Sequence, residues 1–361
     1  MKSLSVIVLL FYILQSPLQA QLTDDFKAID KHAKKAPRNI QTDIKALSAY
    51  LVEPATTELE KARSIYTWIT HNISYDKFAY KEGQNRINKN NRDVLTRRMA
   101  VCFGYSTLFR EMCSFAGLQS EVISGYSKGT LTTKPKLEEP DHAWNAIQID
   151  GQWHLLDATW GSSLIDKTND FVLAFQEGYF LTSPERFIVN HLPANPMWQL
   201  LNCPVLPEVF QKPAEVIIQQ VESSEKCFHY QDSILQFQAL SEDEKILKEA
   251  QAAYQFHPTA TNKKLLGHAH FDFATKQSDL AEELQANQAF DELIEIQADM
   301  LYHCRKAAKY TTLYNWQQEF FINTLINRAV ALSKTLDQLE SAVAQLKQYE
   351  EVLVNLNEAR A

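Results

Sequence analysis

The sequence has few glycines, and they are unevenly spread. Eight of the nine lie between Gly83 and Gly178, and only Gly267 follows. Because glycine marks tight turns and strand ends, we expect turns and strands in the middle of the chain and helices after Gly178. The 361 residues are too many for one small core and fit two modest domains.

The sequence also lacks an excess of positive charge, with 36 lysines and arginines against 44 acidic residues. The formal net charge is −8 at pH 7 and the isoelectric point is about 5.7. Binding to nucleic-acid phosphates needs a basic surface, so the charge balance excludes nucleic acid as the main partner. Apolar residues make up 45% of the chain and charged residues 22%, which excludes wholesale disorder.

Beyond its start the sequence lacks an apolar run of the roughly 20 residues that a membrane span needs. Lys2 precedes the apolar run Leu4–Leu14, and a polar, proline-containing stretch then ends at Ala20. This pattern is typical of a secretory signal peptide, although an N-terminal anchor is an alternative. We expect residues 1–20 to be a signal peptide, and the mature protein to be secreted or periplasmic with no membrane span.

Cysteine is infrequent and odd in number, and no C-x-x-C motif is present, so no metal ion or cofactor is predicted. In an exported protein an odd count leaves at least one free thiol when the others pair. Spacing leaves the pairing open, and buried, unpaired cysteines are equally consistent with it. The five are Cys102, Cys113, Cys203, Cys227 and Cys304.

The first third of the chain carries helix signals. Residues 21–56 are predicted to be a helical lead-in. Thr57 and Glu60 have the spacing of a capping box, which predicts a helix from there to about His71. Residues 76–91 are polar and are predicted to be irregular.

A second helix is predicted over Cys102–Ala116, where apolar residues recur at helical spacing and Gly117 supplies a stop. A strand is expected at 121–126. The stretch Cys203–Pro207 contains two prolines and is interpreted as a linker. It separates a predicted core domain at 57–205 from a C-terminal domain.

The C-terminal domain, 206–361, is predicted to be all helical. Ser241 and Glu244 form another capping box, and leucines recur at helical spacing between Leu336 and Leu356. A packed bundle is the expected arrangement, and its helices are candidates for contact with a protein partner.

Asp150-Gly151 lies between the alternating runs 143–149 and 152–158, which predicts a β-hairpin. With Asp150 and Gly151 as the two turn residues, the numbers of any two residues paired across the strands add up to 301. Trp144 is then opposite Asp157. His142 then lies diagonal to Asp157, about 7–8 Å away at the backbone and within reach of an imidazole–carboxylate contact. A one-residue bulge would instead separate the two side chains.

Cys102 lies where a loop with Arg97 and Arg98 enters a helix. The positive end of the helix and the two arginines favour the thiolate form. A single cysteine is more commonly buried and inert. However, a thiol, a base and an acceptor that fixes the base are the parts of a nucleophilic site, and Cys102, His142 and Asp157 supply them in chain order.

Three segments resemble the transglutaminase-like superfamily: Val101–Ser106, Asp141–Asn145 and Asp157–Gly161. Further segments fit its kyphoscoliosis-peptidase-like branch, and the resemblance covers roughly residues 60–202. These are Asn72–Asp76, Tyr179–Glu185, His191–Pro193 and Trp198–Leu201. The resemblance implies an α+β, papain-like core in which the cysteine helix packs on an antiparallel sheet, with Cys102, His142 and Asp157 as the catalytic triad.

The function expected is therefore an exported cysteine enzyme that acts on amide bonds of peptides or proteins through an acyl-enzyme, as peptidase, deamidase or acyl transferase. A non-catalytic binding or scaffold protein on the same fold is the alternative, since some relatives have lost the cysteine. Four residues are candidates for the substrate cleft, and for the aromatic ones a structural role in packing is the alternative. They are Tyr75, Gly104, Trp144 and Trp160.

Overall fold

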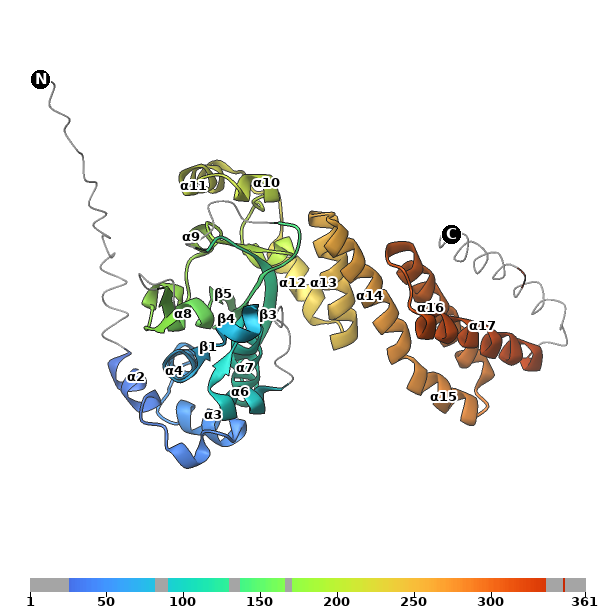
Figure 1. Ribbon diagram of the computed structural model, residues 1–361, viewed down its shortest axis with the longest axis horizontal. Helices are drawn as coiled ribbons and strands as arrows, with labels where there is room; N and C mark the ends of the chain where they lie inside the picture. The colour runs from blue at the N-terminus through green and yellow to red at the C-terminus, as the bar shows by residue number, and fades with distance from the viewer. Residues whose placement is uncertain (1–25, 82–89, 130–136, 166–170, 336–346, 348–361) are drawn as a thin grey trace, which may run out of the picture. The chain divides into compact units, whose positions relative to one another are not determined.

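The computed structural model describes residues 26–81, 90–129, 137–165, 171–335 and 347 (Figure 1). The signal peptide predicted at 1–20 lies outside the described residues, and so does nearly all of the leucine stripe predicted at 336–356. Within the described part of the chain, none of the helices is both long and apolar enough to cross a bilayer.

The chain forms two compact units. The first comprises Met1–Ile123 and Ala143–Ser183, and the second comprises Ser124–His142 and Pro184–Ala361. These units are defined by contacts within the fold, so they do not test the domain limits predicted from the sequence. Those limits, 57–205 and 206–361, stay predictions.

The lead-in is helical where it is described, with α2 (Lys27–Ala33), the 3-10 helix η1 (Arg38–Ile40) and α3 (Ile44–Val52). Helix α4 (Glu58–Asn72) begins at the predicted capping box. Thr57 Oγ1 accepts a hydrogen bond from Glu60 N, and Glu60 Oε2 accepts one from Thr57 N, each at 3.1 Å. This reciprocal pair satisfies two N–H groups that the helix leaves without partners, which confirms the predicted start.

Helix α4 forms the centre of the first unit. It contacts α2, α3, α7 (Cys102–Phe115) and α8 (Ala158–Ser162), and these helices can be followed around it in Figure 1. Its Ile65, Tyr66, Trp68 and Ile69 are fully buried in one apolar cluster. Burial on this scale holds the lead-in helices and the cysteine helix in one core.

The segment predicted to be irregular contains the short helix α5 (Lys77–Lys81), so that prediction was wrong there. Helix α6 (Asn91–Arg97) follows, and the Asn90 side chain caps it by accepting from Asp93 N at 2.8 Å. Strands β1 (Ser74–Tyr75) and β2 (Met99–Ala100) pair in parallel on either side of this stretch.

Helix α7 spans Cys102–Phe115 and ends, as predicted, just before Gly117. Gly117 has a φ of +74°, a left-handed conformation that side chains with a Cβ rarely adopt. The buried residues of α7 include Tyr105, Leu108 and Phe109, so the apolar face predicted from spacing is the packed face of this helix.

The main sheet has the strand order β5-β4-β3-β8. Strands β4 (His142–Ile149) and β5 (Gln152–Leu156) pair with Ile149 opposite Gln152 and Asn145 opposite Leu156, which is the register predicted from the turn. Asp150 and Gly151 have φ of 49° and 75°, the positive values that such a two-residue turn requires. Strands β3 (Ser120–Ser127) and β8 (His191–Pro193) are also antiparallel neighbours.

The prediction of a strand through Ala158 was wrong at its end. Asp157 leaves the sheet and caps the short helix α8 (Ala158–Ser162). Aspartate is among the preferred N-cap residues because its carboxylate accepts from helix N–H groups, and here that preference ends the strand. The small antiparallel pair β6 (Ser163–Ile165) and β7 (Phe171–Leu173) and the 3-10 helix η2 (Glu177–Tyr179) follow.

The second unit is mainly helical, as expected for the C-terminal part, and the fold as a whole is α+β. Its long helices α13, α14, α16 and α17 contact one another in sequence order (Figure 1). Among its described residues, the helices are α9 (Pro184–Phe187), η3 (Pro196–Gln199), α10 (Pro207–Phe210), α11 (Ala214–Ser223), α12 (Tyr230–Gln238), α13 (Glu242–Phe256), α14 (Ala260–Lys276), α15 (Ser278–Ala286), α16 (Phe290–Tyr310) and α17 (Asn315–Thr335).

The pairing of the cysteines, left open by the sequence, is resolved by one disulfide. Cys203 is bonded to Cys227 with an S–S distance of 2.05 Å, across a sequence separation of 24. Cys102, Cys113 and Cys304 are free and buried. The bond joins the predicted linker to the segment after α11.

Candidate functional site

Cys102 is the first residue of α7. Val101, in an extended conformation, is its N-cap. The thiol therefore lies at the positive end of a helix of 14 residues, as the sequence predicted. Cys102 is 5% exposed, and its carbonyl oxygen accepts from Ser106 Oγ at 2.9 Å.

The start of this helix is held from one side by β1. Tyr75 pairs with Ala100, two residues before Cys102, and Asp76 N donates to the Ala100 carbonyl at 2.9 Å. One turn into the helix, the Tyr105 hydroxyl donates to the Ile73 carbonyl at 2.6 Å. Backbone and side chain together fix where the helix begins.

Asn145 fastens the same helix to the hairpin. Its Nδ2 donates to the Ser106 carbonyl at 3.0 Å and to the Glu121 carbonyl at 3.2 Å, and the residue is fully buried. These two donor hydrogen bonds favour one relative placement of α7 and β4, while the buried Oδ1 of Asn145 accepts no hydrogen bond from the described residues. The sequence offered a signal, since Asn145 closes one of the segments that carry the family resemblance.

Asp157 is fully buried at the N-cap of α8. Its Oδ1 accepts from Thr159 N at 2.7 Å and Trp160 N at 3.1 Å, and its own N–H donates to the Tyr179 carbonyl at 3.0 Å. Burial and then the negative charge of Asp157 raise the pKa of Tyr66 well above its usual value. The neighbouring phenol therefore stays neutral beside the carboxylate.

His142 is the first residue of β4 and is 7% exposed. The potential ligand atoms of His142, Asp157 and His191 all lie within 4.8 Å of one another, so the structure brings the first two together. His191 was not predicted as a site residue, although it begins a segment that carried the resemblance. Cys102 is not part of this cluster, and its place in a triad remains a prediction.

His191 is fully buried beside His142, and their ring centroids are 5.4 Å apart. Its ring stacks on Phe187 at 4.1 Å, and its Nδ1 lies 2.6 Å from Asn190 Oδ1. Two imidazoles and a carboxylate are also a set that Zn²⁺ accepts, although Asp157 Oδ1 already accepts two backbone hydrogen bonds.

The four predicted cleft residues differ in burial. Tyr75 and Trp160 are half-buried, and the Trp160 ring meets Tyr179 edge-on with centroids 5.6 Å apart. Trp144 is fully buried in β4, which favours the packing alternative for it. Gly104 is buried in the first turn of α7, where its N–H donates to the Val101 carbonyl at 2.9 Å.

Comparison with known families agrees with this architecture. Residues 45–158 match the model of the Transglutaminase-like superfamily. The chain therefore carries a transglutaminase-like domain, and the resemblance inferred from the motifs is confirmed. The matched range includes Cys102, His142 and Asp157.

The matches to individual relatives are longer than the match to the family model. The chain is 40% identical over 191 residues to kyphoscoliosis peptidase of Mus musculus, covering 52% of this chain and 28% of that protein. It is 29% identical over 206 residues to hillarin of Drosophila melanogaster, covering 52% of this chain and 24% of that protein. The matches thus span only about a quarter of these relatives' length. A solved TGase structure aligns with 42% of this chain and with 35% of its own chain, at 18% identity and a TM-score of 0.26.

Proposed function

We propose that this protein is an exported cysteine enzyme that acts on amide bonds of peptides or proteins through an acyl-enzyme. Cys102 is the nucleophile, His142 the base and Asp157 the group that orients the base. The observation that supports this most is the meeting of His142 and Asp157 in a domain whose cysteine lies at a helix N-terminus.

The proposed reaction has two halves. The Cys102 thiolate attacks the amide carbonyl, and the tetrahedral intermediate expels the amine, which takes a proton from His142 and leaves a thioester. Water or a second amine then attacks the thioester while His142 accepts its proton, which releases an acid or a new amide. The N–H groups of Gly104 and Tyr105 already donate to the Val101 carbonyl, so the two before them, of Cys102 and Phe103 at the start of α7, are the ones suited to bind the oxyanion.

Which acceptor is used decides between hydrolysis and acyl transfer. The similar protein from Mus musculus is named a peptidase, which favours hydrolysis of peptides. Export is supported by the signal-peptide pattern at residues 1–20 and by the disulfide Cys203–Cys227, since disulfides persist in oxidising compartments. Peptides or proteins outside the cytoplasm are the corresponding substrates.

Alkylation by iodoacetamide, with each cysteine followed by mass spectrometry, tests the proposal. Burial raises the pKa of Cys304 to about 12 and that of Cys113 well above its usual value, so these thiols are internal controls. We expect Cys102 to react much faster than both near neutral pH, and His142→Ala to abolish the difference. With a donor peptide, Cys102→Ala is expected to lower the rate at least about 10³-fold.

Alkylation of Cys102 as slow as that of Cys113, and unchanged in His142→Ala, would contradict the proposal. The alternative from the sequence, a binding or scaffold protein on this fold, would then be the better account.

A further inference from the structure

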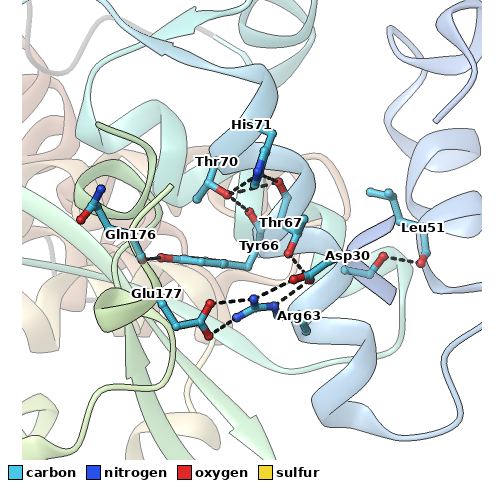
Figure 2. Close-up of polar contacts among 10 residues, drawn as sticks. Asp30, Leu51, Arg63, Tyr66, Thr67, Thr70, His71, Gln176 and Glu177 are labelled. Carbon is cyan, nitrogen blue, oxygen red and sulfur yellow. Dashed lines mark hydrogen bonds and ion pairs between the residues drawn. The ribbon is translucent and has the colours of Figure 1, made fainter. Parts of the chain in front are cut away.

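Arg63, in the middle of α4, is buried between two carboxylates (Figure 2). Its Nε and Nη2 donate to the two oxygens of Asp30, each at 2.8 Å. Its Nη1 and Nη2 donate to the two oxygens of Glu177, the latter bond being 2.8 Å. One guanidinium therefore makes two bidentate pairs, the strongest geometry available to arginine.

The surroundings of this guanidinium are apolar. Arg63 is 2% exposed, and its Cζ lies 4.9, 5.2 and 5.1 Å from the ring centroids of Phe26, Phe175 and Phe180. Burial alone would lower the pKa of Arg63, but the hydrogen bonds to Asp30 and Glu177 raise it. A cation in such a place is stable only while its carboxylate partners stay in position.

Glu177 connects this cluster to Asp157 through η2. The Tyr179 carbonyl, at the end of η2, accepts from Asp157 N at 3.0 Å. Directly before η2, Gln176 N donates to the Gly161 carbonyl at 2.8 Å, and its own carbonyl accepts from the Tyr66 hydroxyl at 3.1 Å. The segment 176–179, which contains Glu177, therefore contacts α8 at two places: at Asp157, the N-cap of α8, and at Gly161, near the end of α8.

The two carboxylates lie outside the part of the chain that matches the family model. That match covers residues 45–158, which include Arg63 but neither Asp30 nor Glu177. Asp30 belongs to α2 in the lead-in, 33 residues before Arg63, and Glu177 lies 114 residues after it. The matched domain alone would leave a buried arginine unpaired.

We propose that Arg63 is a positioning residue for the site: held by Asp30 of α2, it fixes Glu177 and η2, and η2 fixes the backbone of Asp157. This rests on the proposed function, in which Asp157 orients His142. The lead-in helix α2 is then part of the working enzyme. A small displacement of an orienting group is enough to impair catalysis, since a shift of about 1 Å can cost roughly 10²-fold in rate.

The test is the pH profile of Cys102 alkylation in the full chain. Glu177→Gln keeps the Asp30 pair, so the protein is expected to fold, but it weakens the hold on η2. The midpoint of the profile is expected to move up by about one pH unit, which makes alkylation about tenfold slower below the midpoint. Arg63→Lys keeps the positive charge but loses the planar guanidinium that binds both carboxylates in a bidentate way. It is expected to move the midpoint in the same direction.

Thr67→Val is the matched control. It removes the hydrogen bond of 2.7 Å from Thr67 Oγ1 to Asp30 Oδ1 and leaves all four bonds from Arg63. We expect it to lower the melting temperature without moving the midpoint. Glu177→Asp, which restores a shorter carboxylate, is expected to recover part of the shift.

The two proposals fail in distinguishable ways. Fast Cys102 alkylation that is slowed by Asp157→Asn but unchanged by Glu177→Gln overturns the role of Arg63 and leaves the proposed function standing. A shift in Thr67→Val as large as in Glu177→Gln also overturns it, because loss of stability would then explain both. If Cys102 is slow in the unmodified protein and Asp157→Asn changes nothing, the proposed function itself fails.

Discussion

At the scale of single residues, Asp157 has two roles that can be separated. One oxygen caps α8 through Thr159 N and Trp160 N, and the carboxylate also lies in the cluster with His142 and His191. Capping needs only an acceptor oxygen, which asparagine also has, whereas stabilising a protonated imidazole needs the negative charge.

We therefore expect Asp157→Asn and Asp157→Ala to differ in stability and to agree in activity. Both should lower kcat, by about 10³–10⁴-fold if Asp157 acts as the orienting carboxylate of a triad does. Only Asp157→Ala should also lose the cap, at about 1 kcal/mol of unfolding free energy. Urea unfolding and turnover of a donor peptide measure the two effects. Equal stability of the two variants would show that the cap is unimportant.

Gly161 occupies a position where no side chain fits. A Cβ built there would lie 1.9 Å from the Tyr66 hydroxyl oxygen, and Tyr66 is itself fully buried. Gly161→Ala is expected to lower the unfolding free energy by about 1–3 kcal/mol through overpacking and to displace α8. Thermal unfolding checks this, with Gly178→Ala as control, because nothing lies within 4 Å of a Cβ at Gly178. Similar melting temperatures for the two variants would argue against the close approach.

At the scale of elements, two buried histidines join α14 and α16. His270 Nδ1 lies 2.9 Å from His303 Nδ1, and both residues are less than a tenth exposed. Burial, and then the neighbouring His303 and Lys306, lower the pKa of His270 from 6.5 to about 4. The contact between the helices thus depends on a neutral imidazole.

This pair predicts an acid-sensitive helix contact. A histidine whose folded pKa is lowered contributes stability that is complete above its unfolded pKa of 6.5 and is lost as the pH falls from there towards about 4. We expect the unfolding free energy to decrease over this window, and His270→Phe to flatten the decrease. Urea titrations at several pH values provide the measurement. An unchanged slope in His270→Phe would assign the pH dependence to other groups.

At the scale of the whole molecule, the disulfide ties together segments on either side of the predicted boundary at 205/206. The bond between Cys203 and Cys227 closes a loop with a sequence separation of 24. Cross-linking a loop of this size restricts the unfolded chain and is worth about 3 kcal/mol in the chain-entropy model. The linker predicted at Cys203–Pro207 is therefore a constrained segment.

We expect the double variant Cys203→Ser/Cys227→Ser to unfold at a clearly lower temperature than the unmodified protein. Its unfolding free energy is expected to be lower by about 3 kcal/mol. A reducing agent should lower the melting temperature of the unmodified protein and leave that of the double variant unchanged. An equal response of both to the reducing agent would indicate that the bond is not formed in solution.

Much of the local structure was predictable from the sequence. The capping box of α4, the stop of α7 at Gly117 and the register of the β4–β5 hairpin all appear as predicted. Each depends on hydrogen bonds and backbone angles within a few residues. The same locality explains the error at Asp157, where two local preferences, strand and N-cap, competed and the cap prevailed.

By itself, then, the sequence determined the transglutaminase-like domain, the start of α4, the stop of α7, the register of the hairpin and the order of the candidate site residues. Only the tertiary structure decided that His191 joins His142 and Asp157, that Cys203 pairs with Cys227, and that Asp30 and Glu177 meet at Arg63. The chain has 44 acidic residues, and nothing local distinguishes the two that reach this arginine. Which residues become long-range partners depends on how all segments pack together. The free energy of a single contact is small compared with the free energy of burying the apolar surface that brings its partners together.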